Sequence, residues 1–200
     1  LGAVIHEPHD YQTLVIDSVT ALQRLFVAEV LEQDPKAKSI NQALGGYGAG
    51  VAAVAAMHAR VRKGAGLANE KRGMHVVFVA HADVETMRLP DADDYMRYSL
   101  RLPPKSMPPY VDDVDVVGFL RLVTFTKGDD GERKKAISTG DRELVCHAVA
   151  SNISKNRYGL TEALPFAAGE NPLFAVIPAL GAKHAIAAKP KDGAAQKEGE

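Results

Sequence analysis

A short apolar segment that ends in a carboxylate constrains the fold more than any other part of the chain. Residues 13–16 read Thr-Leu-Val-Ile, and Asp17 and Ser18 follow directly. A continuous apolar run of this length is typical of a strand that is covered on both faces in a parallel sheet. Ser is a favoured residue at the start of a helix. The pattern therefore predicts a strand with Asp17 at its C-terminal tip and a helix that begins at once.

Apolar residues recur at helical spacing after Ser18. The stripe consists of Val19, Leu22, Phe26 and Val30. This spacing predicts an amphipathic helix that ends near Asp34-Pro35. Six residues that are mostly glycine follow at 45–50, but no strand precedes them and no Lys-Ser or Lys-Thr comes after. They therefore favour a flexible entry into the next helix over a phosphate loop.

The second helix is predicted from a stripe that starts at Val51 and ends at Val61, with a polar loop over residues 63–73. His58 lies on this stripe, and we interpret it as a packed histidine. Residues 74–80 form another apolar run, and it ends on His81. A helix between two apolar strands is typical of a βαβ unit, which brings the ends of both strands to one sheet edge. Ligands bind beyond that edge in such sheets.

The second half of the chain is predicted to contain more antiparallel hairpins than the first. Irregular segments are expected at 84–94, at the proline pairs 103–104 and 108–109 (an extended crossing), and at 151–159. Strands are expected at 95–102, 111–125, 136–139 and 144–149, with a hairpin turn at 127–131. Residues 182–200 have almost no apolar bulk and are expected to be disordered, which leaves 1–181 as one domain.

Composition excludes several classes of protein. The 200 residues carry a net charge of -1, so a nucleic acid would have to meet local basic patches. The single cysteine, Cys146, excludes an intrachain disulfide and fits a reducing cytosol. No apolar run reaches the ~18 residues of a membrane span, and no signal peptide is recognisable. We therefore expect a cytoplasmic protein with no membrane partner.

Each candidate site residue has a structural alternative. Asp17 could hold a metal ion with Ser18 orienting a metal-bound water, or could be an acid that the helix dipole favours. His81 could sense a phosphate or orient an attacking water, or could bond to the backbone. Lys155 and Arg157 could supply positive charge to a phosphate, or could lie in a solvated loop.

Other chemistries are less well supported. The acidic run of Asp112, Asp113 and Asp115 is more typical of a solvated strand entry than of a metal cluster. Cys146 is expected in mid-strand within an apolar run, which disfavours a nucleophile. The seven histidines show no metal-ligand spacing, and motifs of zinc proteases and serine hydrolases are absent.

Four segments in order resemble the RecA-like P-loop ATPases of phages, in particular the nucleotide-binding proteins associated with single-strand annealing and recombination. The segments are Leu14-Val-Ile-Asp17-Ser18, Val76-Val-Phe-Val-Ala-His81, Asp113-Val-Asp-Val-Val-Gly118 and Lys155-Asn-Arg157. The resemblance spans roughly Asp10 to Pro165. The Asp-Ser ending, in place of Asp-Glu, favours the RecA-like branch over the AAA+ and helicase branches.

The resemblance implies an α/β fold: a RecA-like P-loop NTPase core with a mainly parallel sheet flanked by helices and an antiparallel hairpin region toward the C-terminus. Asp17 matches the Walker B acid, which holds Mg²⁺ through water, and His81 matches the position that senses the γ-phosphate of ATP. Lys155 and Arg157 match basic residues that reach a neighbouring protomer's nucleotide. The implied cofactors are ATP and Mg²⁺, and the implied partners are single-stranded DNA and further copies of the chain.

The chain departs from this family pattern in two respects. The Gly-x-x-x-x-Gly-Lys-[Ser/Thr] loop and the upstream catalytic glutamate are absent from the 200 residues, and we expect both before Leu1, in a longer ATPase. Two rival hypotheses stay open. The chain could be a non-catalytic accessory or DNA-binding protein that keeps the fold without turnover. It could also be an unrelated α/β enzyme that uses Asp17 and His81 as an acid–base pair.

Overall fold

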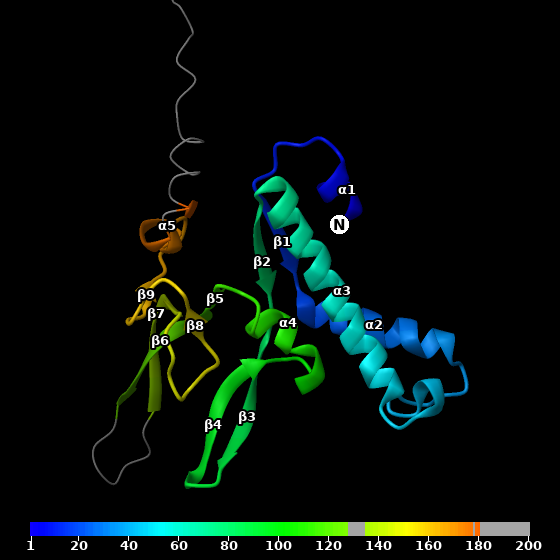
Figure 1. Ribbon diagram of the computed structural model, residues 1–200. Helices are drawn as coiled ribbons and strands as arrows, with labels where there is room; N and C mark the ends of the chain where they lie inside the picture. The colour runs from blue at the N-terminus through cyan, green and yellow to red at the C-terminus, as the bar shows by residue number, and fades with distance from the viewer. Residues whose placement is uncertain (128–134, 178, 181–200) are drawn as a thin grey trace, which may run out of the picture. The chain divides into compact units, whose positions relative to one another are not determined.

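The computed structural model describes residues 1–127, 135–177 and 179–180, and it divides the chain into two compact units (Figure 1). The first unit comprises Leu1–Val117 and Val149–Ile153, and the second comprises Gly118–Ala148 and Ser154–Glu200. Each unit is described by itself. The tail expected over 182–200 lies outside the described residues.

The first unit is organised around two parallel strands. β1 (Thr13–Asp17) pairs with β2 (His75–Val79), so that Thr13 lies opposite His75 and Asp17 opposite Val79. The connection contains α2 (Val19–Gln33) and α3 (Ala49–Arg72). Both predicted strands and their parallel pairing are confirmed, and the fold is mixed α/β. The parallel sheet is small, however, with two strands among the described residues.

Within the described residues of the first unit, one face of this parallel sheet is covered. Leu14 packs against the cluster of Ile5, Ala68 and Met74, and Ile16 packs against the cluster around Val19. Val15, which points to the other face, is 55% exposed. The expectation that both faces are buried is therefore wrong for the described residues, because the packed residues of β1 alternate with exposed ones along the strand.

α2 begins as the sequence predicts. The Ser18 Oγ accepts a hydrogen bond from the backbone N–H of Ala21 at 3.1 Å, which satisfies one of the unpaired donors of the first turn. Val19 and Val30 are buried, at 0% and 1% exposure. The predicted stripe is thus the packed face of α2.

The glycine segment leads into α3. A short 3₁₀ turn, η1 (Ala43–Gly45), is followed by Gly46 and Gly48, and all three glycines at 45, 46 and 48 have positive φ. That conformation is readily adopted by glycine. The segment is therefore a turn before a helix, as expected, and no strand precedes it.

α3 is longer than predicted. Residues 63–72, expected as a polar loop, belong to this helix. Ala65 and Ala68 are fully buried on one of its faces, although most of the residues around them are polar or glycine. α1 (Gly2–His6) contributes Ile5 to the same cluster. Gly73, with φ of 63°, ends α3 in the left-handed conformation. No helix in the described residues combines the length and the hydropathy that a membrane span requires.

An antiparallel hairpin replaces the charged loop expected at 84–94. β3 (Ala82–Leu89) pairs with β4 (Ala92–Leu100), and a Glu85–Arg97 ion pair of 2.7 Å crosses the two strands. Most of β3 is exposed, so it lacks the apolar alternation that reveals a half-buried strand. The strand predicted at 95–102 is confirmed and ends at Leu100.

A short helical turn begins at or directly after each proline pair. η2 (Pro104–Ser106) and α4 (Pro108–Val111) occupy the region where an extended crossing was expected. The expectation is wrong because proline fits the first turn of a helix, where its missing N–H has no intrahelical partner. Tyr110 of α4 is buried at 4% exposure.

The second unit is an antiparallel sheet. β6 (Phe119–Lys127) pairs with β7 (Lys135–Val145), and β7 pairs with β9 (Leu164–Pro165). The predicted hairpin is confirmed, while residues 128–131 of its turn lie outside the described residues. The strand expected over 111–125 is wrong in its first part, because Val111 ends α4 and strand structure begins only at Val116. The two strands expected at 136–139 and 144–149 form one strand that ends at Val145, so Cys146 follows the strand. The remaining elements are β5 (Val116–Val117), at the end of the segment Leu1–Val117, β8 (Lys155–Asn156) and α5 (Leu173–Val176).

Candidate functional site

The parallel pairing brings Asp17 and His81 to the same end of the sheet. Asp17 lies opposite Val79, and His81 comes two residues after Val79. The backbone N–H of His81 donates a hydrogen bond of 3.0 Å to Oγ1 of Thr20, in the first turn of α2. The structure therefore places Asp17, Ser18 and His81 around the start of α2, at the carboxyl ends of β1 and β2.

The Asp17 carboxylate is open to solvent. It makes no hydrogen bond or ion pair with any other described residue, and no group of three His, Cys, Asp or Glu side chains in the described residues could hold a metal ion. A protein-only cage is thus not formed there. Mg²⁺ usually keeps several waters and takes one or two carboxylates besides substrate phosphates, so a single exposed carboxylate fits this metal.

Ser18 is more restricted than Asp17. It is only 7% exposed, and its Oγ already accepts the hydrogen bond from the Ala21 N–H. A hydroxyl that caps a helix still has its own hydrogen to donate. Ser18 can therefore orient an oxygen at this edge only as a donor.

Arg101 also reaches this edge, and sequence analysis missed it. Its backbone N–H donates to the carbonyl oxygen of His81 at 2.8 Å. Nη2 of its guanidinium donates to the carbonyl oxygen of Ala82 at 3.1 Å. Arg101 comes 20 residues after His81 in the chain, and only the return of the β3–β4 hairpin brings the two together. No local pattern in the sequence predicts this contact.

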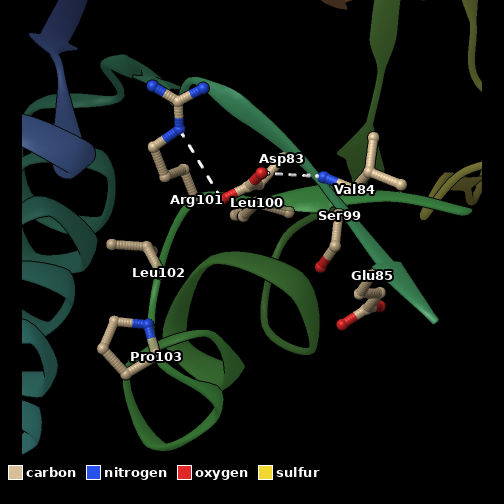
Figure 2. A pocket seen from close by; sticks show the side chains of 8 residues that line it. All are labelled: Asp83, Val84, Glu85, Ser99, Leu100, Arg101, Leu102 and Pro103. Carbon is tan, nitrogen blue, oxygen red and sulfur yellow. Dashed lines mark hydrogen bonds and ion pairs between the residues drawn. The ribbon is translucent and has the colours of Figure 1, made fainter.

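A shallow, open pocket of about 300 Å³ lies at the base of the hairpin (Figure 2). Its lining residues are Asp83, Val84, Glu85, Ser99, Leu100, Arg101, Leu102 and Pro103. Asp83 and Arg101 face each other across the ends of β3 and β4, with 3.8 Å between Oδ2 and Nε. The pocket thus combines apolar walls with charges of both signs next to His81.

Lys155 and Arg157 belong to the second unit and are described within it. Lys155 is half-buried in β8, and Arg157 is exposed directly after this strand. Asn156 lies between them and stabilises the segment around β8, because its Nδ2 donates to the carbonyl oxygens of Cys146 and Leu160 at 2.8 and 2.9 Å. Their action on a nucleotide stays a prediction.

His58 is a packed histidine, as the sequence predicts. It is fully buried between Gln23 Oε1, 2.9 Å from Nε2, and the Tyr110 hydroxyl, 2.7 Å from Nδ1. Burial lowers the pKa of His58 to about 4 and raises that of Tyr110 to about 12. Since a carbonyl oxygen only accepts, Nε2 donates to Gln23 and Nδ1 accepts from Tyr110. This neutral network ties α2, α3 and α4 together.

Cys146 and the acidic run of Asp112, Asp113 and Asp115 are the remaining candidates. Burial raises the pKa of the Cys146 thiol, which is fully shielded from solvent and therefore poorly suited to a nucleophile. In the acidic run, the Asp113 carbonyl oxygen accepts a hydrogen bond from Arg62 Nη2 at 2.6 Å. The run thus helps to attach the end of the first unit to α3.

Comparison with known proteins adds one finding. A family described as an AAA domain matches residues 3–158, which includes most of the chain and every candidate site residue. No curated protein and no solved structure matches the chain.

Proposed function

Since the chain belongs to the AAA domain family, a family of nucleotide-binding ATPases, we propose that it contributes the metal-holding part of an ATP site. The observation that carries this proposal is the placement of Asp17. Its exposed carboxylate stands at the carboxyl end of β1, beside the end of β2 and the start of α2. Ligands of open α/β sheets bind beyond this edge.

Each residue of the edge has a defined task in this proposal. Asp17 holds Mg²⁺ through a water, and the bound metal neutralises charge on the phosphates during in-line attack by water. His81 senses the terminal phosphate or orients the attacking water. The Thr20 hydroxyl accepts a hydrogen bond from the His81 backbone N–H, and this bond fixes the position from which the imidazole extends.

The groups that bind the phosphates are not among Asp17, Ser18 and His81. The 200 residues contain no phosphate loop and no catalytic glutamate in the family's arrangement. Asp17 and His81 therefore account for metal holding and phosphate sensing, and hydrolysis needs a phosphate loop in addition.

The process that we propose is phage-type DNA recombination or single-strand annealing in the cytoplasm of a bacterial cell. The resemblance of the four segments to phage ATPases supports it. In this setting the chain assembles with further copies on single-stranded DNA, and Lys155 and Arg157 supply positive charge to the nucleotide of a neighbouring protomer. The net charge of -1 requires that DNA meets a local basic surface.

Replacement of Asp17 by asparagine tests the proposal. In the full-length gene product that contains this chain, we expect Asp17→Asn to reduce ATP hydrolysis by about a hundredfold or more, because the amide cannot hold Mg²⁺ as a carboxylate does. Asp10→Asn is the matched control, since Asp10 is an exposed acid just before the opposite end of β1. Unchanged hydrolysis in Asp17→Asn, with correct folding by circular dichroism, would refute the assignment.

A non-catalytic accessory or DNA-binding protein that keeps the fold without turnover is the second candidate. The coding sequence before Leu1 separates the two candidates. A strand followed by a phosphate loop there supports the ATPase. A start codon with no such loop supports the accessory protein.

A further inference from the structure

Arg101 is held in place by the core of the first unit. The residues on both sides of it, Leu100 and Leu102, pack in the cluster that contains Val19. This cluster also contains residues of both parallel strands, Ile16 and Phe78. Because its two neighbours are packed inward and its N–H is bonded to His81, the backbone of Arg101 has little freedom. The side chain therefore starts from a determined position at the carboxyl ends of β1 and β2.

The guanidinium of Arg101 makes one hydrogen bond, from Nη2 to the carbonyl oxygen of Ala82 at 3.1 Å, and one long ion pair. Its Nε lies 3.8 Å from Oδ2 of Asp83, and the side chains of the two residues are 57% and 62% exposed. The next ion pair along the hairpin, between Arg97 and Glu85, is 2.7 Å long and its side chains are 29% and 34% exposed. Asp83 itself is anchored, because its Oδ1 accepts from the Val84 N–H at 2.9 Å (Figure 2).

With one backbone hydrogen bond and one long, exposed ion pair, the Arg101 guanidinium has N–H donors left for a phosphate at this edge. A guanidinium offers five donors in a planar fork that matches phosphate oxygens, and charge-assisted bonds of this kind are stronger than an exposed ion pair at 3.8 Å. We propose that Arg101 is a phosphate-binding residue of the nucleotide site, and that Asp83 competes with the phosphate for its guanidinium. This inference rests on the nucleotide binding proposed above.

Competition predicts opposite effects for the two partners. If Asp83 and Arg101 only clamp the base of the hairpin, removing either charge breaks the same ion pair and has the same effect. If Asp83 competes with a phosphate, removing its charge releases Arg101 and tightens nucleotide binding. Removing the charge of Arg101 weakens binding. The direction of the change in Kd therefore separates a ligand role from a structural role.

The experiment is a titration of the full-length gene product with ATP and Mg²⁺, by calorimetry, for the wild type and two variants. We expect Arg101→Gln to weaken binding by about tenfold to a hundredfold. We expect Asp83→Asn to tighten it by about twofold to fivefold. Arg97→Gln is the matched control, since it breaks the neighbouring ion pair of the same hairpin, and its Kd should equal that of the wild type.

The outcomes that overturn the inference are distinct from failure of the proposed function. A wild-type protein that does not bind ATP refutes the nucleotide site and Arg101 with it. A wild type that binds, together with an unchanged Kd in Arg101→Gln, refutes the role of Arg101 alone. Weakening of equal size in both variants assigns the pair to the hairpin's structure. Arg101→Lys keeps the charge without the planar fork, and partial recovery of affinity in a folded protein supports phosphate contact.

Discussion

The backbone N–H of His81 donates a hydrogen bond of 3.0 Å to Oγ1 of Thr20, and this contact joins the end of β2 to the first turn of α2. The two residues are 61 positions apart in the chain. Because Asp17 and Ser18 immediately precede α2, the bond relates His81 to both of them. A side chain that no motif marks thus helps to assemble the candidate site.

Removing the Thr20 hydroxyl should loosen His81. Thr20→Val preserves the branched shape but leaves the His81 N–H to solvent, and we expect the free energy of unfolding to fall by about 1 kcal/mol. If the proposed site operates, ATP hydrolysis by the full-length gene product should fall as well. Thr20→Ser retains a hydroxyl and should behave like the wild type. Urea denaturation checks the stability, and equal stability of the valine and serine variants would contradict the prediction.

The buried His58 should make stability depend on pH. Its pKa is lowered from 6.5 to about 4 in the folded protein, so the folded state binds this proton less well than the unfolded state does. Its contribution to stability is full above pH 6.5 and is lost as the pH falls toward 4. We expect a loss of about 3 kcal/mol across this window. Urea denaturation at several pH values measures it.

A variant isolates the His58 contribution. His58→Gln removes the titrating group, so the slope of stability against pH should flatten between pH 6.5 and 4, even if the variant is less stable throughout. His6→Gln replaces an exposed histidine at the end of α1 and should keep the wild-type slope. A wild-type slope in His58→Gln would show that other groups cause the acid sensitivity.

Replacing two glycines of α3 by alanine should change the free energy of unfolding in opposite directions. A Cβ at Gly50 would lie 2.3 Å from the carbonyl oxygen of Ile40, so Gly50→Ala must shift backbone and should cost about 1–3 kcal/mol. A Cβ at Gly66 would meet only Nη1 of Arg62, at 3.2 Å, which a flexible side chain can vacate. Gly66→Ala should then stabilise by up to about 1 kcal/mol. Thermal unfolding of both variants checks the two signs.

The N-cap of α2 should be worth a measurable amount. Ser18→Ala removes the acceptor of the Ala21 N–H, and we expect a loss of about 1 kcal/mol in the free energy of unfolding. Ser18→Asn supplies another capping side chain and should recover most of it. Equal stability of the alanine and asparagine variants would show that the cap contributes little.

Local patterns were sufficient for the elements that carry Asp17 and His81. The apolar runs at 13–16 and 74–80 predict strands because they are short and bounded by polar residues, and Ser18 predicts the start of α2. The βαβ order then implies parallel pairing, which places both strand ends at one edge. The register of Asp17 with Val79 confirms this arrangement.

Local patterns were insufficient where burial depends on distant segments. The end of α3 looks polar, yet Ala65 and Ala68 are buried, and Ala68 packs with Ile5 of α1 and with Met74, which directly precedes β2. The β3–β4 hairpin has charged residues on an exposed surface, so no apolar alternation marks it. In both cases the decisive contacts join residues that no local window contains.

By itself, the sequence determined the two parallel strands, the cap of α2 and the acid at the tip of β1, because short-range periodicity and capping chemistry act within a few residues. Only the tertiary structure decided that Arg101 and Thr20 lie at the same edge. Arg101 arrives there because Leu100 and Leu102 pack into the core of the first unit, and Thr20 because its hydroxyl meets the end of β2. The hydrophobic effect has no preferred direction or sequence separation, so it can bring together residues that are far apart in the chain.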